Sequence, residues 1–563
     1  MASKVLQFDK NKERYFRLAD QLREKEDYLG ALSLLFSVLE KENDYIAYRK
    51  IAEIYALMEQ FEASNLFWFR HVFYAPKSQV ASSFEELAVN YFYLDNLWAS
   101  GYYFHKKLSI DGVISKQNID PEIMDFFSGE ELKKHAFRVV YPYDKADYSL
   151  EKNNAKRAIR IGAFKDSVKE IEKIPLACRD EETLNDQAVS LLMDDDLKSA
   201  EEVARYSIEK YGETVNAFCT LSTLFDMKKD YENADFYYQK ALSIAKDEPE
   251  DWYRIVSTAI ERKDHEKANE CLYKILKERP NEYIMRFFYA ISFINLGNYQ
   301  SAYRELKTVY LYNPRDFIVE YYINFVKQLM EDRGENQRYL PLEYNKELPK
   351  KESAKWEKKI KDLAKNLDTA NSQIKGENGR KLLIFGMLFG KDLVMRSSVM
   401  LLSLLDAKTV KEISLTVLLN PEVPQEVKKL LLYALVLKGV KGKIGLVAGS
   451  YYCEINLKKL LCEKKKDSRF YILSYALCLS RMVFYGIDDF TKMVNATDML
   501  YKDIGDLITS QDVNNEELAG LILMRSGYEN FADAKTVCAI FDVKKEKLDK
   551  LMEIAIDKRR KND

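Results

Sequence analysis

Bulky and small residues recur along the first three-fifths of the chain with a spacing that predicts paired helices. A bulky residue is followed three positions later by a small one, and this couple occurs eight times. The couples are Tyr28/Ala31, Phe61/Ser64, Leu97/Ser100, Phe164/Ser167, Leu197/Ala200, Tyr231/Ala234, His265/Ala268 and Tyr299/Ala302. From Ala200 to Ala302 the small residues are 34 residues apart. One supersecondary unit repeated at such a period predicts a solenoid of stacked helix pairs.

Other positions of the repeat are also regular. Proline follows the small residue by twelve positions at Pro76, Pro280 and Pro314, where it can end the second helix. With the period of 34, this pattern resembles the tetratricopeptide repeat family, in a divergent form that lacks the usual first-helix glycine. The resemblance covers 181–314, 12–112 and part of 150–175. It implies two antiparallel helices per repeat, which approach closely at the small residues.

We therefore predict an all-α protein: a tetratricopeptide-like right-handed α-solenoid followed by a second, mostly helical domain with one short β-hairpin. The expected segments are N-terminal repeats (1–112), a degenerate repeat or helical insertion (113–149), a main array with a capping helix (150–330), a charged linker (331–380) and a helical C-terminal domain (381–563). The linker has little apolar periodicity and carries one exposed helix near 354–367.

The C-terminal domain shows apolar helical faces and one hairpin pattern. Helices are expected near 381–389, 393–405, 407–418, 425–437, 457–462, 470–485 and 488–503. Strands are expected at 443–448 and 451–456, around Gly449 and Ser450. Because two strands are marginally stable alone, this hairpin near 443–456 must pack on helices.

Composition and charge exclude several classes of protein. Lys+Arg is 87 and Asp+Glu is 89, for a net charge of −2, so no overall attraction to nucleic acid or to an anionic membrane is expected. The N-terminus has no apolar signal core, and charges interrupt every apolar stretch before about 20 residues. The seven cysteines are scattered without a Cys-x-x-Cys pair. We expect a cytoplasmic protein that neither crosses nor binds a membrane.

The sequence offers no recognisable catalytic chemistry. Its four histidines have no ligand-like spacing to one another or to a cysteine, so no metal site is expected. Nucleophile and phosphate-binding motifs are also absent. We predict that the chain is not an enzyme, has no catalytic residues and no cofactor, and has no evident small-molecule substrate.

The family resemblance implies a concave groove lined by the first helix of each repeat. The groove positions give a set of candidate partner-binding residues: Asn216, Thr223, Tyr253, Ser257, Phe287, Ile291, Tyr321 and Phe325. The aromatic and aliphatic side chains of this set favour a partner's helix or extended peptide. The alternative is that the chain's own second domain covers the patch. In the first array the same positions are more polar.

The segment 534–551 has a second interpretation, because it resembles a helix-turn-helix. Its second helix would present Lys544, Lys545 and Lys547, which are interspersed with Glu546 and Asp549. The plainer interpretation is a helical hairpin that closes the C-terminal domain. The main functional hypothesis is a protein-interaction scaffold or adaptor. The alternative is a regulator whose C-terminal segment contacts DNA, although nucleic acid is the less favoured partner.

Overall fold

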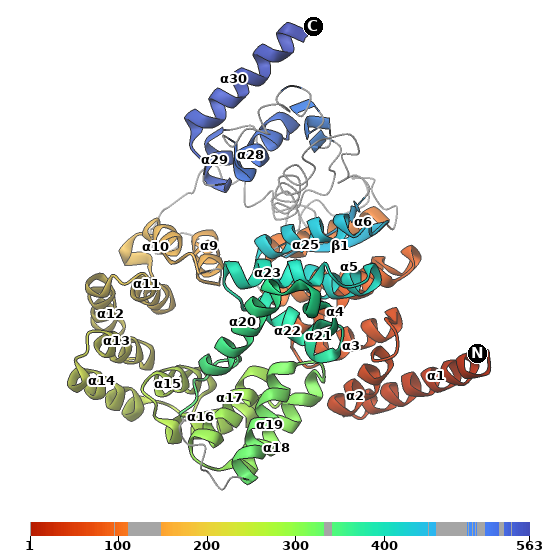
Figure 1. Ribbon diagram of the computed structural model, residues 1–563. Coiled ribbons are helices and arrows are strands. Elements are labelled where there is room, and N and C mark those ends of the chain that lie inside the picture. The colour runs from red at the N-terminus through yellow and green to blue at the C-terminus, as the bar shows by residue number, and fades with distance from the viewer. Residues whose placement is uncertain are drawn as a thin grey trace.

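The computed structural model is almost entirely helical (Figure 1). It describes residues 2–94, 96–110, 148–160, 162–331, 341–448, 450–457, 513–528, 534–541 and 543–562, with a few positions between 492 and 503. Helices α9 to α19 follow one another along an arc, and α20 to α25 lie on its inner side (Figure 1). The predicted fold class is therefore confirmed.

Helices succeed one another as pairs in both arrays. The pairs of the first array are α1 (Ala2–Glu24) with α2 (Tyr28–Leu39), α3 (Tyr45–Leu57) with α4 (Phe61–Tyr74), and α5 (Ala81–Tyr93) with α6 (Leu97–Ile110). The main array has α9 (Ser149–Arg160) with α10 (Phe164–Glu172), α11 (Glu181–Met193) with α12 (Leu197–Tyr211), α13 (Val215–Met227) with α14 (Tyr231–Ile244), α15 (Pro249–Glu261) with α16 (His265–Glu278), and α17 (Tyr283–Asn295) with α18 (Tyr299–Tyr312). The expected capping helix is α19 (Phe317–Glu331).

The turns inside the pairs, where the structure describes them fully, share a geometry that reverses the chain. One residue adopts a left-handed backbone, as at Lys229 (φ 61°), Lys263 (φ 60°) and Gly297 (φ 74°). This conformation costs a non-glycine residue roughly 1–2 kcal/mol. The next residue caps the second helix: Asp230 accepts a hydrogen bond from the Asn233 amide at 3.2 Å, which offsets part of that cost. The same few residues therefore fix the antiparallel arrangement in successive repeats.

The small residues of the repeat lie where the two helices of a pair touch. Ser64 Oγ donates to the Ala52 carbonyl at 2.8 Å, and Ser222 Oγ donates to the Ala234 carbonyl at 2.8 Å. The alanines predicted to lie at these contacts are all fully buried: Ala200, Ala234, Ala268 and Ala302. A larger side chain at these positions would separate the helices.

Ala268→Leu is expected to lower the free energy of unfolding by about 1–3 kcal/mol, because the added methylene groups overpack a closed contact. Urea denaturation followed by circular dichroism measures the effect. Glu266→Leu is the matched control, since Glu266 is exposed on the same helix and should change stability by less than about 0.5 kcal/mol. Equal effects of the two substitutions would contradict the assigned packing.

The end of the main array contacts the first array. The Tyr55 hydroxyl, at the end of α3, donates to the carbonyl of Tyr312 at the end of α18. The Arg315 guanidinium donates to the Leu39 carbonyl at the end of α2. These bonds join residues more than 250 positions apart in the sequence. The two arrays therefore meet at these turns.

The C-terminal elements occur near their predicted positions. The helices are α20 (Lys350–Lys365), α21 (Leu367–Ile374), α22 (Glu377–Leu388), α23 (Asp392–Leu402), α24 (Ala407–Leu418), α25 (Gln425–Leu437), α28 (Asn515–Ser526), α29 (Ala534–Phe541) and α30 (Lys545–Asn562). Strands β1 (Lys443–Ala448) and β2 (Tyr451–Asn456) pair antiparallel. The helices expected at 457–462 and 470–485, most of that at 488–503, and nearly all of the insertion expected at 113–149 lie outside the described residues.

The hairpin packs on the first array. The Tyr103 hydroxyl of α6 donates to the Ser450 carbonyl at 2.6 Å and accepts the Tyr452 amide at 2.9 Å. The Phe69 ring of α4 stacks on the Tyr452 ring, with centroids 6.2 Å apart. The hairpin therefore obtains from α4 and α6 the support that two strands need.

The described part of 331–380 differs from the charged linker expected there. Helix α20 is not a free surface helix: its Ile360 is fully buried. The Trp356 ring stacks on Phe317 of α19 at 5.7 Å and meets the edge of Phe385 of α22 at 5.1 Å. Apolar side chains at wide spacing anchor this charged helix, which is why its periodicity looked weak in the sequence.

Candidate functional site

Two predicted groove residues link neighbouring first helices of the main array. Helix α13 lies against both α11 and α15. Asn216 Nδ2 on α13 donates to Glu181 Oε1 on α11 at 3.0 Å. Thr223 Oγ1, also on α13, donates to Glu261 Oε2 on α15 at 2.6 Å. The structure thus brings these two predicted residues onto a surface shared by adjacent repeats.

Tyr253 and Ser257 continue this surface on α15. The half-buried Tyr253 hydroxyl donates to Glu282 Oε1 at 3.2 Å, and the Arg279 guanidinium lies 5.8 Å from the centre of the tyrosine ring. Ser257 is exposed and donates to the Tyr253 carbonyl at 3.1 Å. Part of the Tyr253 ring therefore remains accessible.

Helix α11 also carries a carboxyl group with a perturbed pKa. Burial, and then the nearby Glu182 carboxylate, raise the pKa of Asp186 on α11 to about 6, against the opposing influence of Lys156 and Arg254. Burial is the larger cause, because it disfavours the charged form of a carboxyl group.

The other predicted residues are covered. Phe287 and Ile291 on α17 are 0% exposed, and Phe325 on α19 is 8% exposed. The half-buried Tyr321 stacks on Phe325 with ring centroids 6.1 Å apart. Phe287, Ile291 and Phe325 belong to one hydrophobic core that also includes Leu342. Three of these four residues are therefore interior, and the chain itself covers this part of the patch, through Leu342 and the last helices and not through the second domain of the alternative given above.

Residues 341–349, hereafter the 341–349 segment, lie against this end of the array without regular secondary structure. The Asn295 side chain at the end of α17 holds the main chain of Leu342 at both polar groups. Its Nδ2 donates to the Leu342 carbonyl at 2.9 Å, and its Oδ1 accepts the Leu342 amide at 2.7 Å. One asparagine amide can replace the pairing of a neighbouring strand in this way.

Tyr344 occupies a site between two repeats. Its hydroxyl is hydrogen-bonded to His265 Nδ1 at 3.0 Å, and the two rings are stacked. The Phe288 ring meets it edge-on, with centroids 6.1 Å apart. Burial raises the pKa of Tyr344 to about 12, so the hydroxyl keeps its proton near neutral pH.

Lys346 and Glu347 lie near the N-terminal end of α17 and beside α19. Lys346 Nζ forms an ion pair with Asp316 Oδ2 at 2.5 Å and lies 4.7 Å from the centre of the Tyr283 ring. The Tyr322 hydroxyl donates to the Glu347 carbonyl at 2.9 Å. The segment therefore runs along α17 from its C-terminal end, at Asn295, to its N-terminal end.

Sequence reasoning missed Asn295, His265 and the 341–349 segment. A signal was nevertheless present, because apolar residues alternate at Leu342 and Tyr344 between two prolines, Pro341 and Pro349. Alternation with period two and flanking prolines are typical of an extended chain with one side against a surface.

The described repeats share one turn geometry, one small-residue contact and one period. They form a tetratricopeptide-like solenoid.

No family model and no curated protein matches the sequence. Similar solved structures include yeast Tom70 (12% identity, 89% of this chain and 98% of that chain, TM-score 0.28). Another is the human IFIT1 dimer with PPP-AAAA (12% identity, 73% and 91%, TM-score 0.29). A third is the TPR2AB-domain:pHSP90 complex of yeast Sti1 (15% identity, 48% and 98%, TM-score 0.20). Such low TM-scores carry no functional argument.

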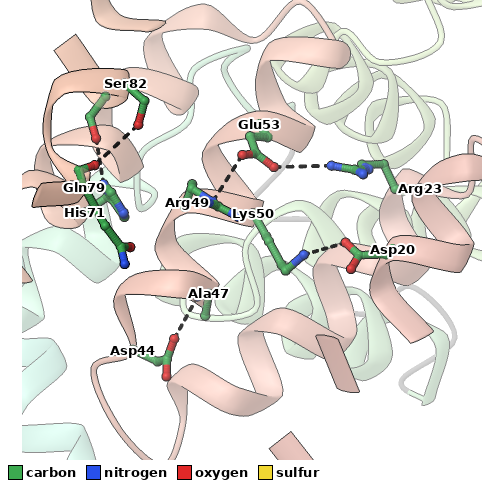
Figure 2. A network of polar contacts seen from close by, with 11 residues as sticks. Asp20, Arg23, Asp44, Ala47, Arg49, Lys50, Glu53, His71, Gln79 and Ser82 are labelled. Carbon is green, nitrogen blue, oxygen red and sulfur yellow. Dashed lines mark hydrogen bonds and ion pairs between the residues drawn. The ribbon is translucent and has the colours of Figure 1, made fainter. Parts of the chain in front are cut away.

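The first array of the solenoid carries a polar network on α1 and α3. Figure 2 shows Glu53 of α3 between Arg23 and Arg49, with ion pairs at 3.3 Å to each, and Lys50 paired with Asp20 at 2.6 Å. The network joins three cationic and two anionic side chains, so it leaves only a small net positive charge for a ligand. Partly exposed pairs of this kind contribute about 1 kcal/mol or less each.

The lysines of the helix-turn-helix alternative are not equally available. Lys544 and Lys545 are exposed, whereas Lys547 Nζ forms an ion pair with the buried Glu517 at 2.6 Å. Val537 and Leu548 are buried. A Cβ atom added at Gly520 of α28 would lie 3.3 Å from both side chains. Helices α28 to α30 thus pack on one another.

Neither a metal centre nor a membrane span is found in the part of the chain that the structure describes. No three His, Cys, Asp or Glu side chains there are grouped to hold a metal ion. None of the described helices is long and apolar enough to cross a membrane.

Proposed function

We propose that this chain is a protein-interaction scaffold that holds an extended segment of a partner protein on the concave face of its main array. The observation that carries the proposal is the 341–349 segment, which lies against α17 without regular secondary structure and is held there by its main chain through Asn295. A surface that binds one such segment by backbone contacts and side-chain pockets is suited to binding another.

The open part of this face supplies the candidate contacts. Asn216, Thr223, Tyr253 and Ser257 lie on two neighbouring first helices. Tyr253 is only half-buried, and an aromatic ring offers contact area at little cost in rotamer entropy.

Tyr253→Ala is expected to weaken peptide binding by about 1–2 kcal/mol, or roughly 5–30-fold, as for an aromatic interface residue. The probe is a peptide recovered from a random library displayed on phage and panned against the full chain. Its affinity is measured by fluorescence anisotropy. The melting temperature should change little, because the Tyr253 side chain is only half-buried.

Two further variants make this result specific. Phe287→Ala should lower stability by about 3–5 kcal/mol, because Phe287 is completely buried and its loss leaves a cavity. Tyr273→Ala removes an exposed tyrosine from a second helix, α16, and should leave binding unchanged. If no recovered peptide distinguishes Tyr253→Ala from Tyr273→Ala, the concave face is not the binding surface.

A further inference from the structure

The chain itself fills one end of its concave face. The 341–349 segment lies against α17 and α19, and three of its alternate residues each contact a different feature of the array. Leu342 is buried in the core of the last repeats, Tyr344 contacts His265, and Lys346 is paired with Asp316. The segment bends at 344–347, and these three contacts hold it on the array as the side chains of a bound peptide would be held.

The Asn295 contact is independent of the side chains of the segment. It pairs with the amide and the carbonyl of a single residue, Leu342, and every residue except proline offers the same two groups. Any extended chain could satisfy Asn295 in this position. Selection among chains must therefore come from the neighbouring side-chain sites.

Two of these sites are selective. The site beside His265 and Phe288 accepts an aromatic ring with a hydroxyl, which Tyr344 supplies. The site at Asp316 accepts a cation, which Lys346 supplies. With the apolar site for Leu342, the array thus recognises the pattern Leu-x-Tyr-x-Lys.

We propose that the 341–349 segment is an intramolecular ligand, and that the partner is a protein presenting a Leu-x-Tyr-x-Lys peptide that displaces it. This inference rests on the proposed function and adds the class of partner and the regulation of the site. The array binds a partner peptide only when the 341–349 segment has left the site. The partner peptide must therefore compete with that segment for the array.

Asp316 keeps hydrogen-bond partners when the segment leaves. It also accepts the Tyr283 hydroxyl at 2.9 Å and the amides of Ile318 and Val319 at 3.0 and 3.3 Å. Its carboxylate is therefore still hydrogen-bonded without Lys346. Asn295 and the Tyr322 hydroxyl lose their partners on the segment, and these are the groups that another peptide main chain would satisfy.

The expected degree of inhibition follows from the tether. A short connection gives the cis segment an effective concentration on the order of 1 mM. If the isolated peptide binds with a dissociation constant of about 100 µM, the cis segment lowers the apparent affinity of a competitor by about tenfold. Moderate cis affinity is thus sufficient for regulation.

The test uses a fluorescent synthetic peptide with the sequence of residues 340–350 and the full chain. The triple variant Leu342→Ser/Tyr344→Ser/Lys346→Ser unloads all three side-chain sites in cis. Anisotropy should show the peptide binding to this variant about tenfold more tightly than to the wild type. Adding Asn295→Ala to the unloaded variant should weaken binding at least about tenfold.

Matched controls separate recognition from a general effect. Asn233→Ala removes an exposed asparagine from the second helix α14 and should leave peptide binding to the unloaded variant unchanged. A peptide carrying Tyr344→Ala should bind at least about tenfold less tightly than the natural sequence. Circular dichroism and melting curves verify that each variant is folded.

A folded unloaded variant that binds the peptide no more tightly than the wild type would overturn the inference. Peptides recovered by library panning that respond to Tyr253→Ala but not to unloading would do the same, while leaving the proposed function intact. If the synthetic peptide binds the unloaded variant but panning recovers no ligand, the proposed function fails, while the 341–349 segment is still an intramolecular ligand.

If the unloaded variant fails to fold, the wild type itself provides the test. An excess of isotopically heavy peptide should accelerate amide hydrogen exchange within residues 342–348 of the chain, because displacement exposes the Leu342 amide that Asn295 now holds. Unchanged exchange at saturating peptide would overturn the proposal.

Discussion

Tyr103→Ala is expected to lower the free energy of unfolding by about 3–5 kcal/mol, the range for removing a large buried aromatic side chain. Tyr103 is 0% exposed. Its ring is stacked between those of Phe84 and Tyr91, with centroids 5.9 and 5.6 Å away. The substitution therefore opens a cavity that stiff neighbouring rings cannot fill.

The same side chain joins two distant parts of the sequence. Its hydroxyl bonds to the carbonyl of Ser450 and to the amide of Tyr452. Burial raises the pKa of Tyr103 well above its usual value, so the hydroxyl remains a donor. Tyr103→Phe keeps the ring stack but deprives two buried main-chain groups of their partner, at a cost of about 1–3 kcal/mol.

Chemical denaturation of both variants measures these losses, and hydrogen exchange locates them. Exchange should increase in the hairpin at 443–456 as well as in α4 to α6. Tyr231→Ala, at a tyrosine that is 66% exposed, should cost less than about 0.5 kcal/mol. A loss below about 1 kcal/mol for Tyr103→Ala would mean that the hairpin does not depend on the first array.

The hairpin also illustrates what the sequence could predict. Strands at 443–448 and 451–456 were expected around Gly449 and Ser450, and the structure pairs Ala448 with Tyr451 across that turn. Local turn chemistry and alternation determine such an element. Its docking partner, Tyr103, is nearly 350 residues away, and no local pattern indicates a contact over that distance.

The groove could be predicted only in part, for a related reason. The period of 34 places Asn216, Thr223 and Tyr253 correctly on first helices, because it is repeated in every pair. It says nothing about a segment outside the repeats. The burial of Phe287 and Ile291 depends on how the last helices pack and on Leu342, whose position is fixed by tertiary contacts within a charged stretch.

A buried lysine provides the other large expected effect. Lys428 on α25 is completely buried, and its ammonium donates to the carbonyls of Asn420 at 2.7 Å and Val447 at 2.5 Å. It thereby ties the end of α24 to strand β1. Burial lowers the pKa of Lys428 from 10.5 to about 7, with a smaller opposing effect from Cys453.

The direction of the pH dependence follows from this lowered pKa. Between pH 7 and pH 10.5 the unfolded chain holds a proton on Lys428 that the folded chain has released. Stability therefore rises with pH through this window, by up to about 1.4 kcal/mol per pH unit. Below pH 7 both states are protonated, and the folded state carries the full cost of a buried charge.

Lys428→Met should remove this pH dependence. From about pH 7 to about pH 9 the stability of the wild type should rise by up to about 3 kcal/mol more than that of the variant. The absolute stability at neutral pH is a poorer test. Methionine removes the cost of the buried charge but leaves two carbonyls without their donor, at about 1–3 kcal/mol each, and these effects nearly cancel.

Lys441→Met removes an exposed lysine and controls for net charge. Urea denaturation at a series of pH values gives the slopes, and equal slopes for Lys428→Met and wild type would show that Lys428 stays charged in the folded chain.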